Sequence, residues 1–229
     1  MEENNNKKAF GNLLLNIVIP VIILTKFSSE EYLGAVPGLI IALAFPIGYG
    51  IYDFIKEKKT NFFSIIGLVS VLLTGAIGLL ELDPQWIAIK ESAIPLVIGI
   101  MVIVFNYTGN PVITKLLFNE SIVNKDLIDR RLEENQQTNA FERVMDRASY
   151  WLAASFLFSA ILNFILAKII VTSPAGTVEF NNEIGRMTAL SFPVIAVPST
   201  VFVVIIFVRL VKSLRTMTGL TLEEIMKGK

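Results

Sequence analysis

Hydrophobic and polar residues occur along this chain in long separate blocks. Each apolar block approaches the roughly 20 residues that a helix needs to cross a hydrocarbon core of about 30 Å. Six such blocks are present, at 12–28, 34–54, 62–81, 92–108, 148–171 and 187–209. The pattern predicts an all-α polytopic membrane protein in which six transmembrane helices form a single membrane domain over 1–229. The first block has no small-x-small cleavage site, so we expect a span there rather than a cleaved signal peptide.

The longest polar segment, 109–147, separates the fourth block from the fifth. Its apolar residues recur at helical spacing; they are Val112, Leu116, Val123 and Leu127. This spacing predicts amphipathic cytoplasmic helices at the inner membrane surface. Near the C-terminus, Thr221 and Glu224 have the spacing of a capping box, which predicts a short cytoplasmic tail helix within 213–229.

The distribution of basic residues predicts the orientation. Lys and Arg concentrate in the cytoplasmic loops of membrane proteins. If the N-terminus is cytoplasmic, all of the 20 basic residues lie on the inner side except Lys26, Lys90, Lys168 and Arg186. Six spans with both termini in the cytoplasm therefore satisfy the rule.

Composition narrows the classes of function. The chain is 53% hydrophobic with a mean hydropathy of +0.63, which is more apolar than an ordinary soluble domain. Its formal net charge is zero, so no attraction to nucleic acid is implied. The chain contains neither Cys nor His, the residues that supply thiol chemistry and the commonest general base and metal ligand. We therefore expect no enzymatic activity, no cofactor and no metal site.

Small and polar residues form stripes along several of the predicted spans. In the second span a small residue or Pro recurs at every fourth position, which predicts a ridge that packs against another helix; the residues expected to pack are Gly34, Gly38, Ala42 and Gly50. The third span carries Thr74, and the fifth carries Ser159 and Asn163. Two interpretations stay open for these stripes: helix packing with interhelical hydrogen bonds, or a polar groove for a substrate or lipid headgroup.

The connector from Leu82 to Pro95 mixes apolar and charged residues between two spans. Asp83 precedes a Pro and has the position of a helix cap. At the outer interface, Trp86 would anchor at headgroup level and Lys90 would lie beside lipid phosphates. Lys168, in the outer part of the fifth span, either extends to the interface or pairs with Glu179 or Glu183.

This connector also carries a family resemblance. The stretch "FFSIIGLVSVLLTGAIGLLELDPQWIAIKESAIPLVIGIMVIVF" resembles the intracellular septation protein A family of bacterial inner-membrane proteins. The matching features are the basic loop at Lys58–Lys59, the Thr74–Gly75 pair, the outer Asp83 and the hook from Trp86 to Lys90. Over these features the resemblance implies a polytopic protein of the bacterial cytoplasmic membrane.

The second half of the chain shows the same resemblance with departures. "FSAILNFILAKIIV", with Asn163 and Ala167, and "IGRMTAL", with Arg186 and Thr188, look like the family's last two spans. The second outer hook, "TVEFNNEIG", lacks the Trp and Lys that the family usually has there, which weakens the case for a pair of outer cations. The segment 109–147 looks like an insertion. The resemblance implies a role in maintaining the cell envelope, linked to division and elongation proteins, and implies no known reaction.

Two functions follow as hypotheses. The first is transporter-like handling of a membrane lipid or of a small anionic or lipid-linked ligand. The candidate binding residues are Thr74, Asp83, Lys90, Ser159, Asn163, Lys168, Arg186 and Thr188. The second is a membrane scaffold whose segment 109–147 recruits division or elongation proteins. A ligand-sized cavity would favour the first, and the sequence leaves homo-oligomerisation open.

Overall fold

A computed structural model describes residues 10–57, 62–109, 111–117 and 123–226. These residues are helical, and their one pairing of β type is an isolated bridge between Val123 and Met226. The all-α prediction is therefore confirmed for this part of the chain. Lys58 and Lys59, which carry part of the family resemblance, lie outside it, as do the basic residues near both termini that enter the charge count.

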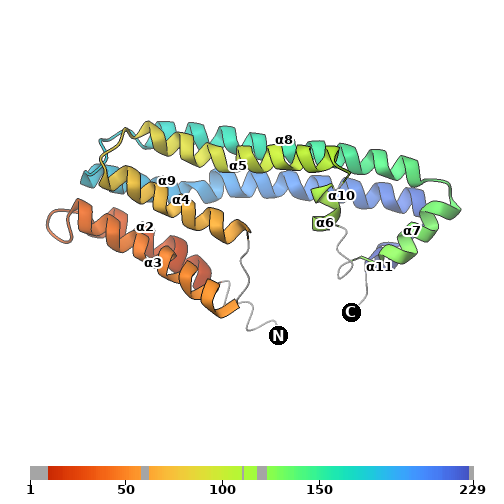
Figure 1. The fold of residues 1–229 in the computed structure, drawn as a ribbon, viewed down its shortest axis with the longest axis horizontal. Helices are drawn as coiled ribbons and strands as arrows, with labels where there is room; N and C mark the ends of the chain where they lie inside the picture. The colour runs from red at the N-terminus through yellow and green to blue at the C-terminus, as the bar shows by residue number, and fades with distance from the viewer. Residues whose placement is uncertain (1–9, 58–61, 110, 118–122, 227–229) are drawn as a thin grey trace. The chain divides into compact units, whose positions relative to one another are not determined.

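Within the described residues, five helices are long and apolar enough to cross a membrane, which supports a multi-pass membrane protein. They are Phe10–Phe27, Ala35–Ile55, Gln85–Tyr107, Thr138–Ile170 and Val178–Thr218. The third predicted span corresponds to a shorter apolar helix, Ile65–Leu79. Figure 1 labels the α-helices, which are α2 (Ile19–Ile22), α3 (Ala35–Glu57), α4 (Phe62–Leu79), α5 (Gln85–Tyr107), α6 (Val112–Leu117), α7 (Lys125–Glu134), α8 (Thr138–Ile170), α9 (Val178–Ser191), α10 (Val197–Thr218) and α11 (Leu222–Ile225). Three π-helical turns adjoin them: η1 (Leu14–Val18) precedes α2, η2 (Ile23–Phe27) follows it, and η3 (Phe192–Ala196) joins α9 to α10.

Two helices begin earlier than the apolar blocks indicate, because polar caps start them. The Oδ1 atom of Asp83 accepts a hydrogen bond of 2.8 Å from the backbone N–H of Gln85, so α5 begins inside the connector and not at residue 92. The hydroxyl oxygen of Thr177 accepts from the N–H of Phe180 at 3.2 Å and starts α9. That helix continues through η3 into α10, so the predicted span at 187–209 lies within a helical run of 41 residues.

The chain divides into two compact units. Unit 1 contains residues 1–94 and 160–195. In it, α3 packs against both α2 and α4 (Figure 1), and α9 packs against η2. Phe180 and Ala42 are fully buried in its hydrophobic core. A Cβ atom at Gly185 of α9 would lie 2.7 Å from Cγ2 of Thr25, so the two helices approach closely there.

The predicted ridge on the second span is shorter in the structure than in the sequence. Ala42 is fully buried, and a Cβ atom at Gly38 would meet Ser28, with that residue's Cβ at 2.9 Å. Gly34 instead precedes α3, with a φ of +77° that suits glycine in a turn. Nothing lies within 4 Å of the position that a Cβ would take at Gly50. Within this ridge, close packing is therefore confined to Gly38 and Ala42.

Unit 2 contains residues 95–159 and 196–229. The predicted amphipathic pattern falls on two helices, with Val112 and Leu116 in α6 and Leu127 in α7. The apolar side chains Ile128 and Leu132 of α7 are buried in the core of this unit, with Leu214 of α10 and Ile225 of α11. The Nδ2 atom of Asn135 donates to the carbonyl of Met217 at 2.8 Å. The apolar face of α7 is thus covered by protein, and only its charged face is exposed.

Candidate functional site

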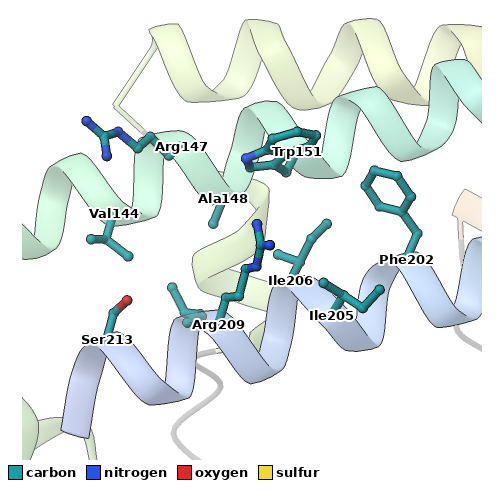
Figure 2. Close-up of a pocket in the computed structure, with 10 residues that line it drawn as sticks. Val144, Arg147, Ala148, Trp151, Phe202, Ile205, Ile206, Arg209 and Ser213 are labelled. Carbon is teal, nitrogen blue, oxygen red and sulfur yellow. The ribbon is translucent and has the colours of Figure 1, made fainter. Parts of the chain in front are cut away.

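A pocket opens between α8 and α10 within unit 2 (Figure 2). Its volume is about 460 Å³, which falls in the range of sites for small ligands. Its lining residues are Val144, Arg147, Ala148 and Trp151 from α8, and Phe202, Ile205, Ile206, Arg209, Leu210 and Ser213 from α10.

The α8 wall follows from helical periodicity. Val144, Arg147, Ala148 and Trp151 are spaced three, four and seven residues apart and so share one face of the helix. Ala148 is buried and keeps α8 close to its neighbours, whereas the Trp151 side chain is 53% exposed. The large indole therefore contributes an open apolar surface beside a guanidinium.

The α10 wall repeats this arrangement in the opposite chain direction. Ile206 and Leu210 are buried and form the floor, while Arg209 points from α10 toward α8 (Figure 2). The rings of Phe202 on α10 and Trp151 on α8 have centroids 6.1 Å apart, so an aromatic contact joins the two walls at their apolar ends.

The pocket therefore has two chemically different ends. Trp151 lies one turn from Arg147 along α8, and Phe202 lies two turns from Arg209 along α10. Both arginines are exposed, and among the described residues neither guanidinium forms an ion pair with a carboxylate. The arrangement offers the Arg209 guanidinium and the Ser213 hydroxyl at one end and aromatic surface at the other; Arg147 borders the same end, but in Figure 2 its guanidinium points away from α10. It suits an amphipathic anion.

The structure brings two of the predicted site residues, Thr74 and Lys90, together in unit 1. The Nζ atom of Lys90 donates to Oγ1 of Thr74 at 2.8 Å and to Oγ of Ser70 at 3.1 Å. It also forms an ion pair with Glu91 at 2.7 Å, and the residue is only 8% exposed. The three protons of the ammonium group thus have three partners. Lys90 connects α5 to α4 instead of extending to the lipid headgroups.

Three other predicted residues have local roles. Asp83 caps α5 through its bond to Gln85. Trp86 is 50% exposed, as an interface anchor requires. The hydroxyl of Thr188 donates to the carbonyl of Ile184 in its own helix at 2.8 Å. A hydroxyl used in this way has its proton occupied, so it cannot donate to a ligand at the same time.

The remaining predicted residues lie on α8 and α9. Ser159 and Asn163 are half-buried on α8, and Lys168 and Arg186 are exposed. Glu183 does not serve as the partner of Lys168. Its carboxylate accepts hydrogen bonds from the backbone N–H and hydroxyl of both Thr172 and Ser173, at 2.8–3.2 Å. This carboxylate fixes the turn between α8 and α9.

Sequence reasoning did not find the pocket between α8 and α10. It used Arg147 and Arg209 only to orient the chain. A signal was nevertheless present, because each arginine borders a predicted span and Trp151 follows Arg147 by one helical turn.

Among the described residues, no group of three or more acidic side chains gathers as metal ligands do.

Comparisons of the chain with models of protein families, with curated proteins and with solved structures gave no match. The assignment of a function therefore rests on the chemistry of the pocket.

Proposed function

We propose that the protein binds an anionic membrane lipid in the pocket between α8 and α10 and handles this lipid in support of the cell envelope. The observation that carries the proposal is the polarity of the pocket. Arg209 presents its guanidinium group at one end, Arg147 borders that end and would turn its guanidinium inward to meet a phosphate, and Trp151 and Phe202 present rings at the other end. A lipid has the same sequence of groups, a phosphate followed by an apolar body.

The proposal includes a topology. The short apolar helix within α4 joins the five longer ones as a sixth span, and both termini are cytoplasmic. This orientation places Arg147 and Arg209 at the inner ends of their spans, where basic residues concentrate. Basic pockets between transmembrane helices on this side are suited to anionic headgroups. The resemblance to the septation protein A family supports a bacterial cytoplasmic membrane.

The headgroup should decide which lipid binds. An acyl chain gains little by moving from hydrocarbon into an apolar pocket, because the lipid tails around it are equally apolar. Arginine forms bidentate hydrogen bonds with phosphate. Each basic side chain near the surface contributes about 1 kcal/mol to the attraction of anionic lipid. Two arginines should therefore give a preference of roughly thirtyfold for anionic over zwitterionic lipid.

Native mass spectrometry of the protein in bilayer discs tests this proposal. We expect the wild type to retain phosphatidylglycerol in preference to phosphatidylcholine, and Arg147→Ala/Arg209→Ala to lose that preference. Lys26→Ala/Arg130→Ala removes the same charge at exposed positions outside the pocket and should keep it. A wild type that holds only exchangeable lipid, or equal losses in both double variants, would contradict the proposal.

The scaffold hypothesis also has an observation in its favour. The face of α7 opposite Ile128 and Leu132 is exposed and carries charges of both signs. Asp129 has a raised pKa because it is partly buried and lies near other acidic groups. A pocket without selective lipid binding, together with a protein partner lost on Arg130→Glu, would favour this second function.

A further inference from the structure

A second hollow lies at the inner end of α10, within the same unit as the pocket. Lys212, Arg215, Thr216, Gly219, Leu220 and Thr221 line it, and its volume is about 400 Å³. Gly219 ends α10 with a φ of +72°, and nothing lies within 4 Å of the position that a Cβ would take there. The left-handed turn at this glycine redirects the chain toward α11 and leaves open space beside two basic side chains.

The hollow and the pocket share α10 as a wall. Arg209 and Ser213 line the pocket, and Lys212 and Thr216 line the hollow. Successive residues of an α-helix are about 100° apart around its axis, so Lys212 and Ser213 face adjacent openings. Arg209 and Arg215 are six residues apart, which corresponds to about 9 Å along the helix.

The cations therefore form two pairs on adjoining surfaces. Arg147 and Arg209 belong to the pocket, and Lys212 and Arg215, both exposed, belong to the hollow. The nearby carboxylate of Glu224 accepts bonds from the N–H and hydroxyl of Thr221 at 2.8 Å. Its charge is thus already partly satisfied by these donors. A lipid with a single phosphate would satisfy one pair of cations and leave the other unused.

We infer that the preferred ligand of this site is a lipid with two separate phosphodiester groups. One phosphate would bind Arg147 and Arg209, and the second would bind Lys212 and Arg215. Lys212 and Arg215 follow Arg209 by about 4.5 and 9 Å along α10 and face another side of the helix, so two phosphates joined by a short polyol fit the two pairs better than a diphosphate, whose phosphorus atoms share one bridging oxygen. This inference rests on the proposed function, because it names the lipid class for the same site.

The alternative explanation is structural, since Lys and Arg at the end of a helix also interact favourably with its dipole. That role would affect the stability of α10 but not the choice between two anionic lipids. The decisive readout is therefore lipid selectivity, with thermal stability measured alongside it.

The experiment compares bilayer discs with cardiolipin and discs with phosphatidylglycerol, matched for total phosphate charge in a phosphatidylcholine background. Native mass spectrometry gives the relative occupancy. We expect wild-type protein to prefer cardiolipin by about thirtyfold, the same factor that two basic contacts give for the first pair of cations. In Lys212→Ala/Arg215→Ala the preference should fall to about one, and Lys212→Gln/Arg215→Gln serves as a second variant if the first is unstable. Lys26→Ala/Arg130→Ala, at exposed positions that line neither the pocket nor the hollow, should retain the wild-type preference.

The outcomes separate this inference from the function on which it rests. Equal binding of cardiolipin and phosphatidylglycerol by the wild type, both above phosphatidylcholine, would overturn the inference and leave the proposed function standing. A wild-type preference that survives in the folded Lys212/Arg215 variants would also overturn it. Binding of neither anionic lipid above phosphatidylcholine would overturn both.

Discussion

Replacing Lys90 with Met provides a direct test of how unit 1 is held together. Methionine has a similar length but no charge and no proton to donate. In the wild type the buried amine of Lys90 donates to Thr74 and Ser70 of α4, and no further donor is left for an anion. We therefore expect Lys90→Met to weaken the pairing of α4 with α5 and to leave lipid selectivity unchanged.

The change in the free energy of unfolding on Lys90→Met follows from the interactions that are lost, the relief from burying a charge, and the partners that the neighbouring hydroxyls keep. Interhelical hydrogen bonds in membrane proteins contribute about 0.6 kcal/mol on average and at most about 1.7. Two of them, to Thr74 and Ser70, are lost, together with the ion pair between Lys90 and Glu91. Relief from burying a charge acts in the opposite direction, but Lys90 is the sixth residue of α5, near the helix end, where this cost is well below the roughly 2.5–3.5 kcal/mol at the bilayer centre. Thr74 keeps an acceptor, the Ser70 carbonyl at 3.1 Å, whereas the Ser70 hydroxyl loses the donor that Lys90 supplies.

These terms give a net loss of about 1–2 kcal/mol in the free energy of unfolding. Circular dichroism during titration of micellar protein with sodium dodecyl sulfate measures this quantity. A double-mutant cycle with Thr74→Val should return a coupling of about 0.6–1.7 kcal/mol between the two side chains. Ser92→Ala is a suitable control, because the Ser92 hydroxyl donates only within α5, to the carbonyl of Ile89. Unchanged stability combined with lost anionic lipid would refute the reasoning.

Two further predictions concern packing and capping. Gly185→Ala should destabilise unit 1 by about 1–3 kcal/mol in the same unfolding assay, because the added Cβ would lie 2.7 Å from Cγ2 of Thr25, whose hydroxyl is already bonded to its own helix. Gly50→Ala adds a Cβ in open space and should be neutral. Equal losses of stability in the two variants would argue against the close contact at Gly185. The pKa of Glu224 is lowered because the backbone N–H and hydroxyl of Thr221 donate to its carboxylate. A lowered folded-state pKa means that the cap stabilises α11 above about pH 4.5, the ordinary value, and is lost as pH falls through the folded value; hydrogen exchange of α11 should show this dependence, and Glu224→Gln should abolish it.

The apolar blocks predicted where most helices lie, because a membrane requires long apolar runs and helical backbone pairing. The helix starts were harder to predict. The first turns of α5 and α9 contain charged and amide side chains, and hydropathy alone assigns such turns to loops. Caps at Asp83 and Thr177 start these helices earlier. The capping box at Thr221–Glu224 was predicted correctly, because that signal is local.

The candidate site was less predictable than the helices. Whether a lysine near a helix end reaches the headgroups or a neighbouring helix depends on which side chains face it, and Lys90 faces Thr74. The pocket depends on α8 lying against α10, so that Arg147 and Arg209 share one opening. Periodicity defines the faces of each helix, but it does not specify which faces meet.

The length of α8 offers a way to locate the membrane experimentally. Its 33 residues extend about 50 Å at 1.5 Å per residue, whereas the hydrocarbon layer is about 30 Å thick. Some part of this continuous helix must therefore stand in water, and each turn marks a further step of about 5.4 Å along one axis. Because the natural chain contains no cysteine, a single thiol introduced at successive turns would be the only reactive sulfur of its kind. The accessibility of each introduced thiol to a water-soluble reagent would show where along α8 the lipid boundary lies.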